Sequence, residues 1–320
     1  MGAIQYPVVT TQLPPMTLQS LPASSQPPLL RTDQRQGWFK QLFSLRGSVI
    51  PAVLPRTTLC MAFAGVIYGL YQRQWPVSVP ILGTLVPSLV LGLLLVFRTN
   101  TSYERFWEGR KLWGNVINLS RNLARHIWVA IAAPQPADHQ AKLNAIHLLP
   151  AFAVAMKLHL RGQAPDRQLA SLVTAPQFAR LQTLQNPPLQ IALWLAEYLQ
   201  EQQTAGRLHP YQLTTCMESL DGLVSSLGGC ERILKTPMPL AYSIHLKQLL
   251  MLYCLALPFQ MVASVGWITP LLVGLISFAV FGIEEIGIEI ENPFGDDAND
   301  LPLDAICRTM AQNIEDLLDS

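Results

Sequence analysis

The densest cluster of chemically active side chains is an acidic stretch near the C-terminal end of the sequence. Eight carboxylates fall between positions 284 and 304, and no Lys or Arg occurs between Lys247 and Arg308. Like charges at this spacing repel one another unless they are protonated, solvated or bound to a cation. The sequence therefore predicts a compensating partner for the charge of Glu284, Glu285, Glu289, Glu291, Asp296, Asp297, Asp300 and Asp304.

The middle of this stretch is a turn rich in side-chain oxygens. It reads Asn292-Pro-Phe-Gly and continues with Asp296, Asp297, Asn299 and Asp300. Carboxylate and amide oxygens are the hard ligands that Ca²⁺ and Mg²⁺ require. The order does not match an EF-hand loop, because the alternating Asp positions and the terminal Glu are missing. Two interpretations stay open: a cation site, or a solvated acidic turn that caps a helix at Asp300.

A second candidate lies in the uncharged segment from Pro76 to Phe97. Leu85, Leu89 and Leu93 recur at positions i, i+4 and i+8, so a helix presents them on one face. Lipid contact or bundle packing explains such a face, because Leu is the commonest choice in a membrane helix. A pore lining is the alternative, in which several subunits bring their leucines together in a constriction that gates by dewetting.

Candidate catalytic and metal–thiolate sites are missing from the sequence. It contains no phosphate loop, no G-x-G-x-x-G and no G-x-S-x-G, and its Ser, His and Asp residues lack a strand-turn-helix setting. The five cysteines form no C-x-x-C pair, and the six histidines do not supply zinc-ligand spacing. We therefore predict unpaired core cysteines, no enzymatic activity and no required cofactor.

The composition points to a membrane. Of 320 residues, 50% are hydrophobic and only 13% are charged, about half the charged share of a soluble domain. The net charge of +1 offers no electrostatic reason to expect a nucleic-acid partner. The lipid bilayer is the expected surrounding.

Four apolar segments could cross that bilayer. The last uncharged run, the 36 residues 248–283, is too long for one crossing, so we expect a reversal near 259–267. Charges interspersed with apolar residues at helical spacing predict water-facing helices over 98–236. The predicted order is a flexible tail (1–30), membrane helices at about 53–71, 76–97, about 240–258 and about 266–283, an acidic turn (289–304) and a C-terminal helix (305–320).

The distribution of cations sets the predicted orientation. Lys and Arg precede the first apolar segment and follow the second, whereas the reversal carries none. The positive-inside rule then places both termini and the 98–247 region in the cytoplasm. Spanning helices rather than alternating strands favour the inner (plasma) membrane, and a thylakoid-type membrane stays an alternative.

Three segments resemble the signature segments of the bestrophin family, in its bacterial and plant-like branch. They are RTNTSYERFWEGRKLWG (98–114), CERILKTPMP (230–239) and ENPFGDDANDLPLD (291–304). The resemblance extends over about residues 35–310, within an expected channel domain of residues 31–310, and implies an all-α membrane protein. In this family four transmembrane helices and a cytosolic helical domain form each subunit of a homopentamer. The motif positions at the cytosolic end of the second helix are Arg98, Asn100, Arg105, Trp107 and Glu108.

The resemblance also implies roles for particular residues. It assigns a hydrophobic neck to Leu85, Leu89 and Leu93, and a second, cytosolic constriction to the region of 187–199. Animal members bind Ca²⁺ through the acidic turn, and the matching positions here are Glu289, Asn292, Asp297 and Asp300. Glu289 stands where Gln is usual, Ala298 and Asn299 break the acidic run, and the bacterial branch is not regarded as Ca²⁺-gated.

The function implied is a passive anion channel of the chloride type. The expected partners are further copies of the chain, permeating monovalent ions and the lipid bilayer. A monovalent cation channel of the sodium type, with the same fold, is the alternative, since bacterial relatives include cation-conducting members. A membrane scaffold that docks a partner without conducting ions is a third hypothesis.

Overall fold

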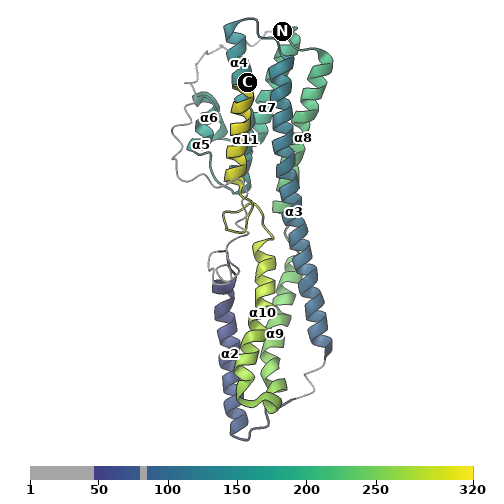
Figure 1. Cartoon of the computed structure of the whole chain (residues 1–320), viewed down its shortest axis with the longest axis vertical. Coiled ribbons are helices and arrows are strands. Elements are labelled where there is room, and N and C mark those ends of the chain that lie inside the picture. The colour runs from purple at the N-terminus through teal and green to yellow at the C-terminus, as the bar shows by residue number, and fades with distance from the viewer. Residues whose placement is uncertain (1–46, 80–84, 320) are drawn as a thin grey trace. The chain divides into compact units, whose positions relative to one another are not determined.

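The computed structural model describes residues 47–79 and 85–319, with side chains of the second stretch from Pro87 onward. The described residues form helices and loops and contain no strand (Figure 1). They divide into two compact units. The apolar unit comprises 47–79, 85–113 and 228–301, and the second unit comprises 114–227 and 302–319.

Helices α2 (Ile50–Gln72), α9 (Leu240–Val265) and α10 (Thr269–Glu289) pack against one another in the apolar unit. Pro51 suits the first turn of α2, because the missing N–H would have no partner there. The buried side chains of α2 recur every three or four residues, so one stripe of the helix faces its neighbours. The stripe consists of Val53, Thr57, Cys60, Ala64 and Ile67.

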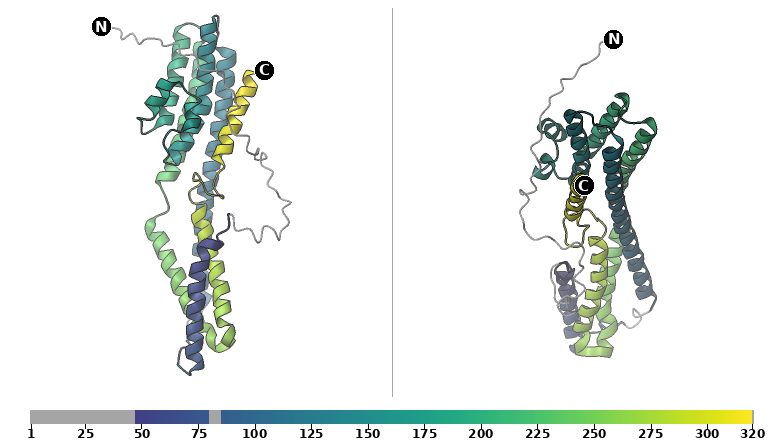
Figure 2. Two further views of the ribbon diagram at one scale, coloured as in Figure 1. Left: turned by 90° about the vertical axis from the view of Figure 1, so that its left-hand side faces the viewer. Right: turned by 45° about the horizontal axis from the view of Figure 1, so that its top comes forward.

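A tight reversal joins α9 to α10, which lie side by side (Figure 2). It consists of the short 3₁₀ helix Gly266–Ile268, which overlaps the end of the predicted interval 259–267, because α9 continues to Val265. Gly266 has φ +55°, a backbone conformation that side chains disfavour and glycine tolerates. Thr269 stabilises the turn by donating its hydroxyl to the Gly266 carbonyl at 2.6 Å.

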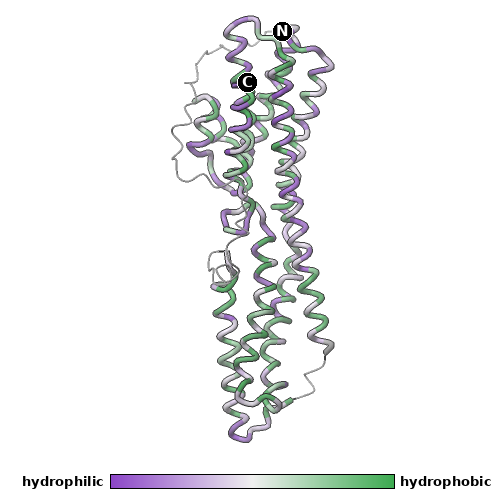
Figure 3. Tube along the Cα trace, viewed as in Figure 1, coloured by the Kyte–Doolittle hydropathy of each residue, from purple (hydrophilic) through white to green (hydrophobic). Residues whose placement is uncertain are grey.

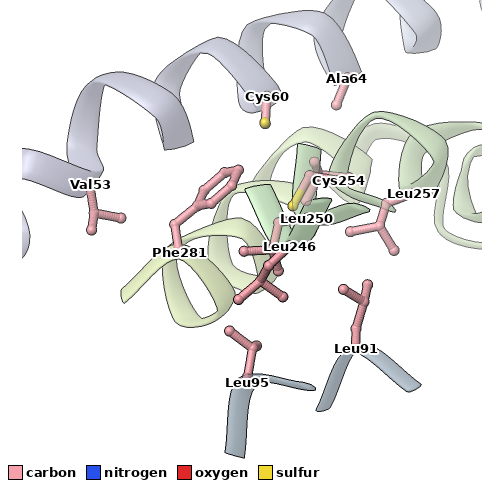
Figure 4. Packing of buried hydrophobic residues seen from close by; sticks show 11 residues of the cluster. Val53, Cys60, Ala64, Leu91, Leu95, Leu246, Leu250, Cys254, Leu257 and Phe281 are labelled. Atoms are coloured by element: carbon pink, nitrogen blue, oxygen red, sulfur yellow. The ribbon is translucent and has the colours of Figure 1, made fainter. Parts of the chain in front are cut away.

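The first part of α3 (Leu85–Ala130) completes the apolar core. Leu91 and Leu95 point toward Leu246 and Leu250 of α9, in a cluster that also contains Phe281 of α10 (Figure 4). Clusters of this kind stabilise a fold because each buried leucine removes apolar surface from water and gains van der Waals contacts with neighbouring side chains.

The helix of the second apolar segment does not begin at Pro76, whereas the membrane boundary at Phe97 stays a prediction. Residues 76–79 are irregular, and α3 begins at Leu85 rather than at Pro76. Prolines at 76 and 80 explain the late start, because a proline disfavours helical backbone in the residue before it. The helix then continues past Phe97 to Ala130, since nothing in the polar sequence beyond Phe97 interrupts it.

The second unit is built around α4 (Pro136–Leu160), which contacts α7 (Pro187–Thr204) and α11 (Leu303–Leu318). Two short helices, α5 (Arg167–Ala170) and α6 (Ala175–Leu181), follow α4. Helix α8 (Pro210–Lys235) begins in this unit and ends in the apolar unit, and α3 likewise contributes to both. Nearly every residue of α4 from Ala145 to Leu160 is buried, so α4 forms the core of the unit.

Three helical segments among the described residues are long and apolar enough to cross a membrane (Figure 3). They are Ile50–Gln72, Pro136–Leu160 and Leu240–Glu289, the last of which contains the α9–α10 reversal. Inside the protein, 78% of the most apolar part of α4 is buried, against 28% for α2 and 39% for Leu240–Glu289. The hydrophobicity of α4 is thus used within the fold, whereas α2, α9 and α10 keep apolar surface outside it.

Candidate functional site

The predicted neck residues lie on α3. Leu89 is 66% exposed and Leu93 51% exposed, whereas Leu91 and Leu95 are 7% and 5% exposed. The side chain of Leu85 lies outside the described part of the structure. The face that carries Leu89 and Leu93 is therefore left uncovered by the described residues, and the opposite face of α3 is packed into the core.

Arg98 lies on the buried face of α3, one turn beyond Leu95. It is 3% exposed, and its guanidinium donates to the Glu291 carboxylate at 3.2 Å and to the Ser243 hydroxyl at 3.1 Å. A buried cation is costly unless it is paired and hydrogen-bonded, and here both conditions hold. Gly287 lies beside this side chain, and a Cβ there would lie 3.4 Å from Cγ of Arg98, an ordinary van der Waals distance.

Arg105 binds backbone carbonyls on three sides. Its guanidinium donates to the carbonyl oxygens of Ile233 and Thr236, and its Nε donates to that of Glu291 at 3.2 Å. The last carbonyls of a helix have no partner within the helix, so Arg105 satisfies the C-terminal end of α8. It fixes that end of α8 to α3 and to the residues after α10.

Glu291 is the point at which the three signature segments meet. Its carboxylate accepts from Arg98 of the first segment and from the backbone N–H of Met238 of the second, at 2.9 Å. Its carbonyl accepts from Arg105. The three signature segments are therefore joined in one cluster, which we call the anchoring site. Its members are Arg98, Arg105, Met238, Tyr242, Ser243 and Glu291.

Gly109 extends the contact between the first and third segments. A Cβ at this position would lie 3.1 Å from the ring of Phe294 and from Pro293, so glycine allows Phe294 to pack directly on α3. Phe294 is fully buried. Glu108 forms a surface ion pair with Arg232 at 2.7 Å. The two remaining motif residues, Asn100 and Trp107, are exposed and lie outside the anchoring site.

Most of the acidic stretch has partners within the protein. Arg56 lies 2.8 Å from Glu285 and 3.6 Å from the buried Glu284, and Glu289 accepts from the amide of Asn299. The prediction that something compensates this charge is confirmed for Glu284 and Glu285, whose partner is an arginine of the same chain. Glu289 is hydrogen-bonded by a neutral amide instead.

Asp304 is paired within the second unit. Lys157 and Arg161 of α4 donate to its two carboxylate oxygens at 2.7 and 2.9 Å. Burial raises the pKa of Asp304, but the hydrogen bonds and charges of the two cations outweigh this and hold it below its ordinary value. Lys157 is a single cation in an otherwise apolar run, and that isolation is the sequence signal for a buried partner.

The four predicted calcium ligands do not converge. Glu289 is engaged with Asn299, the Asp300 carboxylate accepts the Asp297 N–H at 2.8 Å, and Asn292 accepts the N–H of Phe294 at 3.4 Å. Among the described residues, no three His, Cys, Asp or Glu side chains are placed to hold a metal ion. Calcium binding at these positions stays a prediction.

Asp300 also does not cap the next helix along the chain. Helix α11 begins at Leu303, and its N-cap position is Pro302, which offers no side-chain hydrogen bond. Asp300 instead closes the turn through Asp297. The capping alternative is therefore wrong.

The cysteines lie in the interior. All five are free and buried, as predicted. Burial, with the Glu108 and Glu231 carboxylates nearby, raises the pKa of the Cys230 thiol to about 12. Burial likewise raises the pKa of Cys307 to about 12. Neutral buried thiols are poor nucleophiles and poor metal ligands, so these residues act as small core side chains.

Several members of the anchoring site carry no sequence signal. Ser243 belongs to no motif but accepts from Arg98, and the Tyr242 hydroxyl donates to the Leu94 carbonyl at 2.8 Å. Both residues follow the Pro-rich end of the second segment. Their hydrogen bonds hold the start of α9 against α3. Only the folded chain shows that these positions face each other.

Comparison with known proteins assigns the family. The family model described as bacterial/fungal bestrophin protein matches residues 30–316. A voltage-dependent anion channel-forming protein of Nostoc sp. is 58% identical over 286 residues, which cover 89% of this chain and 93% of that protein. A protein of the same description from Synechocystis sp. is 54% identical and covers 88% of this chain and 92% of that protein.

A solved structure agrees with these relatives. A bacterial bestrophin homolog from Klebsiella pneumoniae superposes with a TM-score of 0.76 at 30% identity, over 83% of this chain and 98% of that chain. Sequence motifs, family model and fold therefore agree, and the chain belongs to the bacterial/fungal bestrophin family.

Proposed function

We propose that this chain forms a passive anion channel of the chloride type, as a homopentamer with a hydrophobic neck lined by Leu85, Leu89 and Leu93. The observation that carries the proposal is the exposure of Leu89 and Leu93 on a helix whose opposite face is packed. The names of the relatives, voltage-dependent anion channel-forming proteins, support the class of ion.

The described residues leave Leu89 and Leu93 without a cover. Burying such a side chain is worth about 1.5–3 kcal/mol, which favours contact with lipid or with other copies. Around a symmetry axis, each leucine position becomes a ring of equal side chains from all subunits. Rings of this kind form a narrow apolar constriction that ions cross only after losing part of their hydration.

The pairing of the acidic stretch favours anions over cations. A cation filter needs carboxylates that are free to face the pathway. Glu285, Glu291 and Asp304 are each paired with a buried or half-buried Arg or Lys instead. This pairing removes much of the negative charge that the sequence alone offers to a sodium-type pore.

The proposed orientation in the membrane is based on which residues are apolar and exposed. The exposed apolar residues of α2, α9 and α10 face lipid, and the second unit lies in the cytoplasm together with both termini. The first part of α3 supplies the remaining crossing. The inner (plasma) membrane is the proposed location.

Reconstitution of the purified chain into a planar bilayer tests the proposal. Under a KCl gradient, the reversal potential of the current lies near the chloride equilibrium potential if the channel passes anions. Replacing KCl by NaCl then leaves it unchanged. A reversal near the cation equilibrium potential would establish the sodium-type alternative, and absence of current under both gradients would favour the scaffold.

A further inference from the structure

Asn299 makes a cross-link between two distant segments of the apolar unit. Its Nδ2 donates to the backbone carbonyl of Gly47 at 3.2 Å and to the carboxylate of Glu289. Gly47 precedes α2, and Glu289 ends α10. One side-chain amide therefore joins the acidic turn, the start of the first helix and the end of the last apolar helix.

The two oxygens that Asn299 joins are of the kind that a divalent cation would bridge. A backbone carbonyl and a carboxylate are both hard donors. The NH₂ group of an amide has two hydrogens with partial positive charge, so it can bind one oxygen with each. The amide therefore joins the two oxygens without a bound ion, and no ion has to lose its hydration shell.

The surroundings of the cross-link are specific to this position. Gly47 has φ +73°, and a Cβ there would lie 3.4 Å from Oδ1 of Asn299, so the carbonyl is presented by a backbone turn that favours glycine. A cleft of about 430 Å³ opens beside it, with Tyr103, Glu289 and Asn299 in its lining. Solvent and ions can therefore reach the two oxygens.

We infer that the Asn299 amide takes the place of a cation in this chain. It holds Gly47 to the end of α10 without an ion, so the stability of this junction does not depend on Ca²⁺. The inference also explains why the predicted calcium ligands do not converge: Glu289 is already occupied by Asn299. It does not rest on ion conduction, because the cross-link lies within one chain.

Replacing the amide by a carboxylate should reverse this property. Asn299→Asp removes both donated hydrogen bonds and places a second negative charge next to Glu289, with Asp297 and Asp300 in the same turn. The carboxylates then repel one another unless a cation binds. The variant should therefore need Ca²⁺ where the wild type does not.

Thermal unfolding of the purified full-length chain in detergent tests the inference, measured in EGTA and in 1 mM CaCl₂. The wild type should unfold at the same temperature in both. Asn299→Ala should unfold about 2–4 °C lower in both, the size expected for the loss of hydrogen bonds worth about 1 kcal/mol. Asn299→Asp should unfold lower in EGTA and regain stability in CaCl₂ in a saturable manner.

Asn100→Asp is the matched control, because Asn100 is exposed on α3 outside the cross-link. It should be insensitive to CaCl₂. The inference is overturned if CaCl₂ stabilises the wild type, if Asn299→Ala unfolds like the wild type, or if Asn299→Asp responds to CaCl₂ no more than the control does.

Discussion

Two faces of α3 carry the same residue type at the same spacing but have different surroundings. Leu91 and Leu95 pack into the apolar core with α9, whereas Leu89 and Leu93 are exposed. Residue type and helical period are identical, so neither decides which face is which. The difference teaches that a helix with two apolar faces uses one for its own fold and offers the other to lipid or to further copies.

The packed face of α3 continues into a polar contact. One turn beyond Leu95 it carries the buried Arg98, which is bound to Glu291 and Ser243. This contact admits few arrangements, since a shifted helix would leave a charge buried without a partner. The anchoring site therefore fixes the rotation of α3 and, with it, the direction of Leu89 and Leu93.

The largest expected effect is that of removing Arg98. Arg98→Met leaves Glu291, whose side chain is 19% exposed, without its cation, and we expect a loss of about 3–5 kcal/mol in the free energy of unfolding. Thermal unfolding in detergent measures it. Arg232→Met is the control, because Arg232 is 69% exposed and should change stability by no more than about 0.5 kcal/mol. Equal effects would show that Arg98 does not anchor the packed face.

The next effect separates the two faces directly. Leu95→Ala creates a cavity in the core and should cost about 2–5 kcal/mol. Leu93→Ala should cost far less in the folding of one chain, since its side chain is already half exposed. Chemical denaturation of both variants provides the comparison. A cost for Leu93→Ala as large as that for Leu95→Ala would place both leucines in one core.

Conduction should show the opposite order. Leu89→Ala combined with Leu93→Ala widens the proposed neck and lowers the dehydration barrier, so single-channel conductance should rise severalfold or selectivity should fall. Leu91→Ala should leave the conductance of folded channels unchanged. Single-channel recording in planar bilayers measures this, and unaltered behaviour of the double variant would remove the neck assignment.

The smallest effect concerns a pair in the second unit with one buried and one exposed member. Asp304 has a lowered pKa, so its pairing stabilises the protein above the ordinary Asp pKa of about 3.9, and this stability is lost as pH falls through the lower folded-state value. The effect should stay at or below about 1 kcal/mol, because the Asp304 side chain is 54% exposed.

Unfolding temperatures measured between about pH 3 and pH 6 check this dependence. In Lys157→Met the acid-induced loss of stability should shrink, and in Asp304→Asn the part due to this pair should vanish. A profile of Asp304→Asn that matches the wild type would show that another carboxylate is responsible.

Part of the fold could be predicted because local patterns determine it. The reversal between α9 and α10 follows from an uncharged run that is too long for one crossing and contains Gly266. The signature segments could be recognised as family motifs. Their meeting at Glu291 could not be predicted, because contacts between positions such as Arg98 and Ser243 depend on how helices far apart in the sequence pack.

Other features could not be read from composition. The uncharged run from Pro76 predicts one helix, but residues 76–79 are irregular, since a proline disfavours helical backbone in the residue before it. Helix α4 is as apolar as a membrane helix yet is buried in protein, and only packing distinguishes the two cases. The oxygen-rich acidic turn predicts a cation site. The sequence alone does not show that Asn299 acts as a hydrogen-bond donor there, because its acceptor, the carbonyl of Gly47, is distant in the sequence.

Cysteine accessibility at the two faces of α3 tests the central claim most directly. The five native cysteines are buried, so an introduced thiol is the main target for a membrane-impermeant reagent. We expect Leu93→Cys channels to lose current when treated with a negatively charged methanethiosulfonate, faster than with a positively charged one, while Leu95→Cys channels keep their current. Two results would contradict an anion pathway along this face. One is that the current of Leu93→Cys channels persists in the anionic reagent, and the other is that it falls faster in the cationic reagent.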